Sequence, residues 1–229
     1  MDIYQVSMCK IMQAALEQFG RNGYRKTGVR HIAEASGVSL GLVNHYFGSK
    51  RMLGQQALLL LMEFLTEQVK RYVDIQEQPV LFDLTATRIQ IRYLLASRFR
   101  QFYLDCMEEG VLSDSMLAYP DEVLVNLKEK YAFSDSNDYI LLYSRYLPSY
   151  LEKILVLGKE NGQFASIDYE DVPFIICRAA KERFLPLEKI VQADMTSRQL
   201  EPDILTAIPD GPDEDFVRRY ICNLSLPLQ

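Results

Sequence analysis

The chain has 229 residues, of which 48% are hydrophobic, 24% charged and 11% aromatic, and this ordinary globular composition excludes a disordered or fibrous protein. The net charge of −6 argues against a nucleic-acid partner for the chain as a whole. However, residues 1–55 carry seven basic and three acidic side chains, a net charge of +4, and residues 56–229 carry a net charge of −10. This asymmetry predicts a polyanionic partner for the N-terminal part alone.

The sequence gives no sign of export, membrane insertion or a metal site. Residues 1–10 lack the basic and apolar segments of a secretory signal, and the most apolar window, residues 52–65, is shorter than the roughly 20 apolar residues of a membrane span. The four cysteines are widely spaced, and neither histidine lies near one of them. We therefore expect reduced thiols in a cytoplasmic protein, with no membrane partner, metal or cofactor.

Helical periodicity runs through the N-terminal part, where alternating strand patterns are absent. The predicted helices of this part cover residues 3–21, 28–36, 40–47 and 50–74. Thr27, Ser39 and Ser49 immediately precede the last three and are expected to cap them, because a hydroxyl can accept from the free amides of a first turn. Gly37 is expected to end the second helix.

The remainder of the chain is also predicted to be helical, which makes the expected fold class all-α. After a linker at residues 76–79, the predicted helices cover residues 81–109, 121–130, 137–160, 169–193, 199–207 and 213–224. Pro148 and Pro186 fall inside two of them and are expected to kink these helices.

The segment from Thr27 to Lys50 has the spacing of a helix-turn-helix. Two short helices are joined by Gly37-Val38-Ser39, Ala33 is small enough for a close helix crossing, and Val38 and Val43 can fill the corner. The second helix would then lie in the major groove of DNA. The alternative is an ordinary corner in a helical protein, which the charge asymmetry disfavours.

The outward positions of the second helix suit contacts with bases. Asparagine can pair with adenine, leucine can contact a thymine methyl group, and glycine permits a close approach of the backbone. Lys50 and Tyr46 are placed to hold phosphates. The candidate DNA contacts are Thr27, Arg30, Ser39, Leu40, Gly41, Leu42, Asn44, His45, Tyr46 and Lys50.

Residues 10–58 resemble the DNA-binding region of the TetR family of bacterial transcription regulators. The resemblance is carried by Ala14-Ala15-Leu16-Glu17-Gln18-Phe19, Gly23-Tyr24, Ile32-Ala33, Gly37-Val38-Ser39 and His45-Tyr46-Phe47-Gly48-Ser49-Lys50. The chain departs from the family at Leu40 to Asn44, where a basic and a hydroxyl contact are lost. The resemblance implies a homodimer joined by a bundle of its last two long helices and an effector pocket between the middle helices.

Gly37-Val38-Ser39-Leu40-Gly41 also matches the G-x-S-x-G turn of hydrolases. That turn needs a preceding strand and a downstream acid and histidine, whereas here a helix precedes it and His45 lies in the same short helix. We therefore expect no catalytic residues and no enzymatic activity.

Several side chains beyond the helix-turn-helix are candidates for an effector pocket. Arg88 falls on an apolar stripe, where it is either the counter-charge for an anionic ligand or an internally paired arginine. The alternative for the aromatic candidates, and the more common role of such residues, is plain core. The candidate ligand contacts are Arg88, Phe99, Phe102, Tyr103, Tyr143 and Tyr146. They predict an apolar or aromatic effector with a negatively charged head group.

The expected organisation is a three-helix DNA-binding domain at residues 1–49, a connecting helix at 50–75 and a helical effector-binding and dimerisation domain at 76–229. The expected partners are double-stranded DNA, a second copy of the chain and a small-molecule effector. We expect a repressor that the effector releases from a palindromic operator. The alternatives are a TetR-like protein controlled by a protein partner and a helical enzyme or carrier.

The predicted dimer interface combines residues 169–193 with residues 213–224. The second segment presents an apolar stripe that something must cover, and its members are Phe216, Val217, Tyr220, Ile221 and Leu224.

Overall fold

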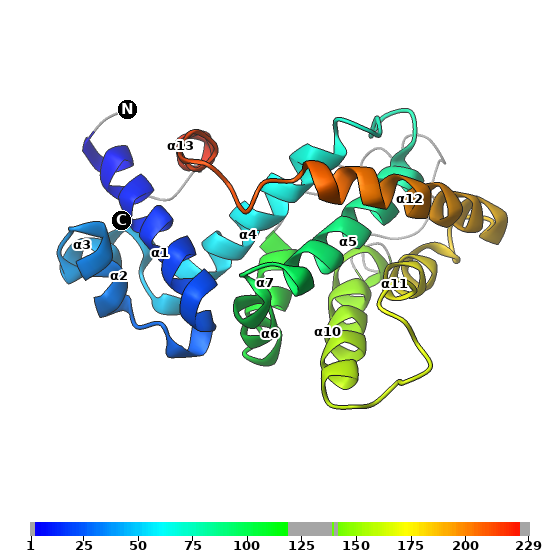
Figure 1. Cartoon of the computed structure of the whole chain (residues 1–229), viewed down its shortest axis with the longest axis horizontal. Helices are drawn as coiled ribbons and strands as arrows, with labels where there is room; N and C mark the ends of the chain where they lie inside the picture. Colours follow the sequence, from blue (N-terminus) through cyan, green and yellow to red (C-terminus); the bar gives the residue numbers. More distant parts are fainter. Residues whose placement is uncertain (1–2, 119–138, 140–141, 225–229) are drawn as a thin grey trace. The chain divides into compact units, whose positions relative to one another are not determined.

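The computed structural model describes residues 3–118, 139 and 142–224, and within these residues it is built of helices without a strand (Figure 1). The predicted all-α class is therefore confirmed. The helices are α1 (Ile3–Lys26), α2 (Val29–Ser36), α3 (Leu40–Phe47), α4 (Lys50–Val69), α5 (Pro79–Ala96), α6 (Arg100–Glu108), α7 (Val111–Ala118), the π-helical turn η1 (Leu142–Tyr146), α10 (Leu147–Glu160), α11 (Val172–Lys181), α12 (Leu187–Ala207) and α13 (Glu214–Asn223). The helix predicted over residues 121–130 lies outside the described residues. None of the described helices is long and apolar enough to cross a membrane.

Two of the long predicted helices are each divided in the structure. The segment predicted at residues 81–109 forms α5 and α6, and the segment at 169–193 forms α11 and the beginning of α12. Pro186 lies immediately before α12 in an extended conformation, with ψ of 137°, so it separates two helices and the predicted kink is wrong. Pro148 lies in the first turn of α10, directly after η1, so the helical geometry changes close to this proline.

The chain packs as two compact units that do not follow its linear order. Unit 1 comprises Met1–Phe64, Leu94–Ser115 and Pro209–Gln229, and unit 2 comprises Leu65–Tyr93 and Met116–Ile208. This division differs from the contiguous domains expected from the sequence, because α6 and α13 pack in the same unit as α1 to α3.

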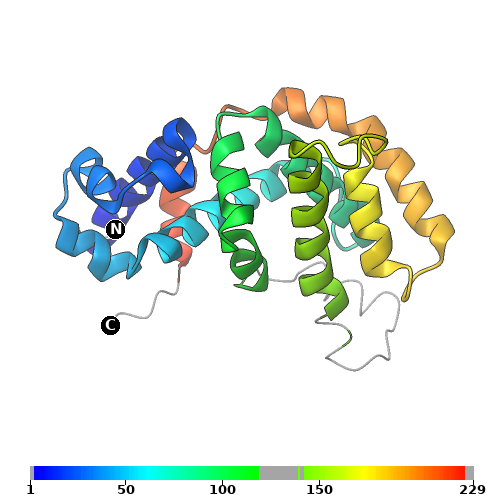
Figure 2. The same cartoon turned by 90° about the horizontal axis from the view of Figure 1, so that it is seen from below.

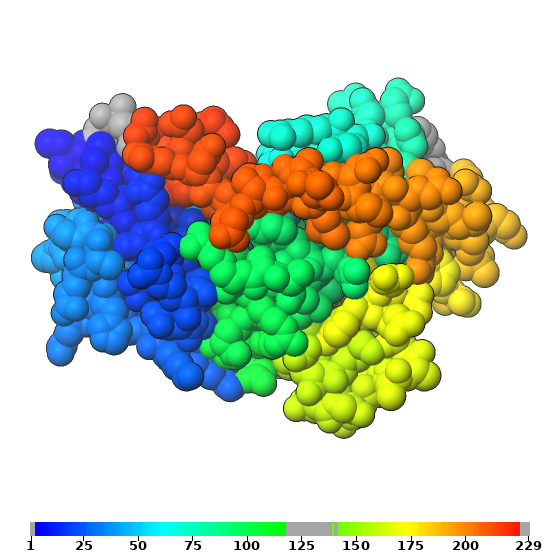
Figure 3. Space-filling view, in the orientation of Figure 1, coloured from blue at the N-terminus to red at the C-terminus, as the bar shows by residue number. Residues whose placement is uncertain are grey.

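Helix α1 is the central element of unit 1, and it packs against α2, α3, α6 and α13 (Figure 2). Its Ile11, Met12 and Phe19 side chains have no solvent exposure. The Phe19 ring stacks on Phe102 of α6, with ring centroids 4.7 Å apart and an interplanar angle of 11°. Helix α13, in red, lies beside α1, in blue, in the space-filling view (Figure 3). The DNA-binding candidates are therefore supported by chain segments far away in the sequence.

Candidate nucleic-acid interface

The predicted helix-turn-helix is present in unit 1 and is fixed by local backbone geometry. Gly37 ends α2 in the left-handed conformation, with φ of 67°, which glycine adopts without strain. Ser39 then caps α3, because its Oγ accepts from the amide of Leu42 at 3.3 Å. Val43 and Phe47 of α3 are only 1% and 2% exposed, so one face of this short helix is anchored in the core.

The opposite face of α3 is open to solvent. Gly41, Leu42, Asn44 and His45 are exposed and Leu40 is half-buried, as the sequence predicts for a helix that reads base edges. An amide, an imidazole and apolar carbons on this face can hydrogen-bond or pack against groups in the major groove. The half-buried Tyr46 has an edge-to-face contact with Tyr4, with ring centroids 6.5 Å apart.

Two of the three predicted caps are confirmed and one is wrong. Ser49 caps α4 by accepting from the amide of Met52 at 3.2 Å. Thr27 does not cap α2, whose N-cap residue is Gly28. The Thr27 hydroxyl instead donates to the carbonyl oxygen of Gly23 at 2.7 Å, and the side chain is 1% exposed, so it closes the last turn of α1 and is not accessible to a phosphate.

Lys50 is also engaged within the protein. Its Nζ donates to the carbonyl oxygen of Arg25 at 3.2 Å and lies 4.5 Å from the centre of the Tyr24 ring. Burial lowers the pKa of the Lys50 ammonium, because it disfavours the charged form. This bond uses one of the three ammonium hydrogens, so the phosphate contact predicted for Lys50 stays a prediction.

Other cations of unit 1 divide into paired and unpaired side chains. Arg25 pairs with Glu108 at 2.5 Å and with Glu109 at 2.8 Å, and Arg51 pairs with Asp114 at 2.5 Å. Lys26 and Arg30, at the end of α1 and the start of α2, are exposed and form no ion pair within the described residues. Arg30 was a sequence candidate, whereas Lys26 was missed, although its charge beside the α1–α2 turn was a usable signal.

The predicted ligand contacts do not come together in one place. Phe99, Phe102 and Tyr103 belong to unit 1, where they are at most 1% exposed. Tyr143 and Tyr146 belong to unit 2, where Tyr143 packs edge-to-face on Phe184 with centroids 5.7 Å apart. The first three residues are core, which is the alternative that the aromatic spacing left open.

Arg88 of α5 is completely buried in unit 2, and each nitrogen of its guanidinium has an internal partner. Its guanidinium donates to Ser197 Oγ at 3.0 Å and to the carbonyl oxygen of Glu170 at 2.8 Å, and it pairs with the carboxylates of Asp194 and Glu201. Burial lowers the pKa of Arg88 and the two carboxylates oppose this effect. Arg88 is therefore the internally paired arginine of the two alternatives, and no longer supports an anionic effector.

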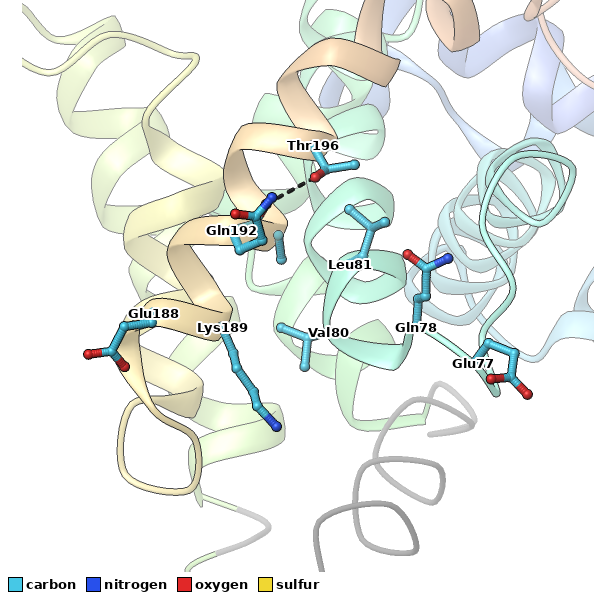
Figure 4. Close-up of a pocket in the computed structure, with 9 residues that line it drawn as sticks. Glu77, Gln78, Val80, Leu81, Glu188, Lys189, Gln192 and Thr196 are labelled. Carbon is cyan, nitrogen blue, oxygen red and sulfur yellow. Dashed lines mark hydrogen bonds between the residues drawn. The ribbon is translucent and has the colours of Figure 1, made fainter.

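Unit 2 contains an open groove of about 470 Å³ between α12 and the start of α5 (Figure 4). Val80, Leu81 and Ala193 supply apolar surface. The polar lining residues are Glu77, Gln78, Glu188, Lys189, Gln192 and Thr196. None of the six predicted ligand contacts lines this groove. The described part of the chain contains no cluster of three or more His, Cys, Asp or Glu side chains suited to a metal ion.

Comparison with known proteins identifies the helix-turn-helix region. Residues 11–57 match the family model described as bacterial regulatory proteins, tetR family. The HTH-type transcriptional regulatory protein RaaS of Mycobacterium tuberculosis is 59% identical over 44 residues, which are 19% of this chain and 20% of that protein. The HTH-type transcriptional regulator BetI of Vibrio campbellii is 23% identical over 174 residues, covering 73% of this chain and 86% of that protein.

Solved structures with similar helices have low sequence identity. A tetR-family transcriptional regulator from Streptomyces coelicolor is 17% identical, with 97% of this chain and 98% of that chain covered and a TM-score of 0.48. A gamma-butyrolactone receptor described as an ArpA-like protein is 13% identical, with 88% and 98% covered and a TM-score of 0.41.

Proposed function

This chain belongs to the TetR family of bacterial regulatory proteins, and from that premise we propose that it regulates transcription by binding double-stranded DNA through α2 and α3. The observation that carries the proposal is the division of α3 into two faces. Val43 and Phe47 anchor one face, while Gly41, Leu42, Asn44 and His45 are exposed on the other. A short helix held in this way can enter the major groove without unfolding.

The proposed contacts fall into two classes. Leu42 and Asn44 select the sequence by touching base edges, and Arg30 and Lys26 supply phosphate contacts that do not depend on sequence. The remaining positions of the proposed base-reading face are Leu40, Gly41 and His45. Asn44→Ala should therefore lower the preference for the selected sequence, whereas Arg30→Gln should weaken binding to every duplex and reduce its salt dependence.

We propose further that the protein acts as a homodimer on a palindromic site. Leu187, Val191 and Met195 recur every four residues along α12 and are 40%, 38% and 55% exposed, so they form one apolar row on that helix. A dimer in which a second copy covers this row would carry two recognition helices, one from each copy. Two such helices reach successive major grooves when they are about 34–36 Å apart.

We also propose that a small molecule releases the protein from its operator and that the protein is a repressor. The groove of about 470 Å³ in unit 2 supports this proposal, because its volume lies within the range of ligand sites. Control by a protein partner is the alternative. A thermal-shift screen of metabolites against the wild type and Leu81→Trp tests whether a small molecule binds in the groove. Because Leu81 lines the groove, a compound that binds there should stabilise the wild type and not the variant.

Selection of duplexes from a random DNA pool tests the DNA-binding proposal as a whole. The expected result is a palindrome whose half-site centres lie about 10 base pairs, or a multiple of this, apart. A transcription assay with the selected site placed at a promoter then gives the sign of regulation. Failure to enrich any sequence at low salt would remove the DNA-binding proposal.

A further inference from the structure

Arg25, next to the end of α1, has both of its backbone polar groups bonded by side chains of other helices. Its N–H donates to Asp105 Oδ2 of α6 at 2.8 Å, and its carbonyl oxygen accepts from Lys50 Nζ of α4 at 3.2 Å. Backbone groups at a helix end are otherwise left to water or to local caps. Helices α6 and α4 therefore both hold the residue from which the chain turns towards α2.

The Asp105 carboxylate is buried and used on both oxygens. The residue is 3% exposed, and its Oδ1 accepts from the side-chain amide of Gln101 at 2.8 Å. The Arg25 guanidinium pairs with Glu108 and Glu109 instead, so Asp105 is the acid that holds the Arg25 backbone. A buried carboxylate is costly unless such bonds are kept, which means that the geometry around it is well determined.

The turn at Gly23, a kink within α1, is shaped to admit this carboxylate. Gly23 has φ of 77°, and a Cβ atom there would lie 2.8 Å from Asp105 Oδ2 and 2.7 Å from Gln101 Cγ. Only glycine suits both the conformation and the close approach of α6. The hydroxyl of Thr27 then closes the same turn through the Gly23 carbonyl.

We infer that Asp105 is a positioning residue for DNA recognition: by holding the Arg25 amide it sets the direction in which α2 and α3 leave α1. The inference rests on the proposed DNA-binding function. Asp105 is buried and has no access to a base or a phosphate, so it acts through the placement of α3. Reading base edges needs a defined placement of that helix, whereas attraction to phosphates tolerates small displacements.

Whether Asp105→Asn strengthens or weakens DNA binding distinguishes a positioning role of Asp105 from a purely electrostatic one. If Asp105 acted only through its charge, Asp105→Asn would strengthen DNA binding, because it removes a negative charge from a protein that binds a polyanion. If Asp105 positions the turn, the substitution weakens binding. Asparagine offers the Arg25 amide only a neutral carboxamide oxygen, and a hydrogen bond to a neutral acceptor is weaker than one to a carboxylate.

The experiment uses the full chain and the duplex that the wild type selects from a random pool, with a shuffled duplex of the same composition. For Asp105→Asn we expect about tenfold weaker binding to the selected duplex and a change within about twofold on the shuffled duplex. Glu108→Gln is the matched control, because it removes the same charge from an exposed residue of the same helix. It should bind the selected duplex as tightly as the wild type or more tightly.

Amide hydrogen exchange provides a readout on the turn itself, since the Arg25 N–H should lose protection in Asp105→Asn and keep it in Glu108→Gln. If Asp105→Asn does not fold, Asp105→Glu replaces it, because it keeps the charge and moves the carboxylate by one methylene from the position that accepts from the Arg25 amide. Unchanged or tighter binding of the selected duplex by the folded variant overturns the inference. A wild type that selects no duplex overturns the proposed function itself.

Discussion

Two carboxylates next to Arg88 in unit 2 are each shared between two arginines. Asp194 pairs with Arg88 and, at 2.7 Å, with Arg198, and Glu201 pairs with Arg88 at 3.5 Å and with Arg92 at 2.7 Å. A buried ion pair adds little net stability over an apolar core, but removal of one partner leaves an uncompensated buried charge. The stability of unit 2 therefore depends on keeping the whole set of charges.

We expect Arg88→Met to lower the free energy of unfolding by about 3–5 kcal/mol, because methionine fills the space but leaves Asp194 and Glu201 short of a partner. Urea unfolding followed by circular dichroism measures the change. Arg178→Met is the control, since its bond to Glu182 is an exposed i,i+4 pair worth about 0.5 kcal/mol or less. A loss below about 1 kcal/mol for Arg88→Met would show that the buried charges rearrange or become hydrated.

Glu17 of α1 provides a pH-dependent contribution in unit 1. A hydrogen bond from Arg98 lowers the pKa of Glu17, and the charges of Arg98 and Arg21 act in the same direction. Because the pKa in the folded state lies below that of the unfolded chain, this stabilisation is present above the unfolded pKa and is lost as the pH falls through the folded pKa.

Glu17→Gln should therefore lower the free energy of unfolding at pH 7, and the difference from the wild type should disappear under acid conditions in which Glu17 is protonated. The Glu17 side chain is 39% exposed, so we expect a loss of less than about 1 kcal/mol. Urea titrations at several pH values measure it. The assignment would be contradicted by a difference that persists unchanged in acid, since a protonated Glu17 no longer carries a charge for Arg98.

At the scale of elements, α13 is packed as an integral helix of unit 1. Val217 and Ile221 are each 1% exposed, and the Tyr220 hydroxyl lies 3.1 Å from Gln56 Oε1 of α4. Phe216 packs edge-to-face on Phe64, with centroids 5.4 Å apart. The apolar stripe predicted to need a second copy is therefore covered by α1 and α4 of the same chain, so the stripe no longer argues for a dimer interface on α13.

The thiol of Cys9 reports on this packing. Cys9 of α1 is 6% exposed, and burial is the main cause that raises its pKa, so less of the reactive thiolate forms. Ile221→Asp places a charge against α1 and should loosen α13. We expect Cys9 to react with a maleimide several-fold faster in this variant, as measured by mass spectrometry of the labelled peptides.

Cys222 is exposed and should be labelled in both proteins, which makes it the internal reference for the reagent. Arg219→Asp is the matched control, because Arg219 lies on the exposed face of the same helix. Equal labelling of Cys9 in the wild type and in Ile221→Asp would mean that α13 does not protect it.

The short N-terminal elements could be predicted because their signals are local. Gly37, Ser39 and Ser49 end or begin helices through bonds to residues within four positions. Thr27 was misassigned because a hydroxyl can bond backwards to a carbonyl as readily as forwards to an amide. Asp105 carried no signal at all, because its partner Arg25 lies 80 residues away.

For the whole molecule, the sequence indicated which residues are buried but not what they are buried against. Phe99, Phe102 and Tyr103 have the periodicity of an inward face, and they are indeed at most 1% exposed. Periodicity does not predict that Phe102 packs against Phe19 of unit 1, because this contact joins segments over 80 residues apart. The same limit explains why contiguous domains were predicted where the units are interleaved.

Assembly of two copies is expected to depend on α12 and not on α13. We expect Val191→Asp to convert the proposed dimer into monomers, because it places a charge in the exposed apolar row of α12. Val217→Asp should lower the stability of unit 1 and leave the dimer intact. Sedimentation velocity distinguishes the two. Dissociation by Val217→Asp but not by Val191→Asp would place the interface on the face of α13.

The interleaving of unit 1 also has a consequence for the order of events on the ribosome. Residues 3–64 are translated first, but α6 and then α13, which cover α1, are translated later. At ordinary rates of translation, residue 223 is added on the order of ten seconds after α1. During this interval the apolar side of α1 is not yet covered by α13. A nascent chain therefore holds a recognition helix whose support is incomplete. We therefore expect the finished polypeptide, and not a translation product that lacks α6 or α13, to bind the proposed DNA site.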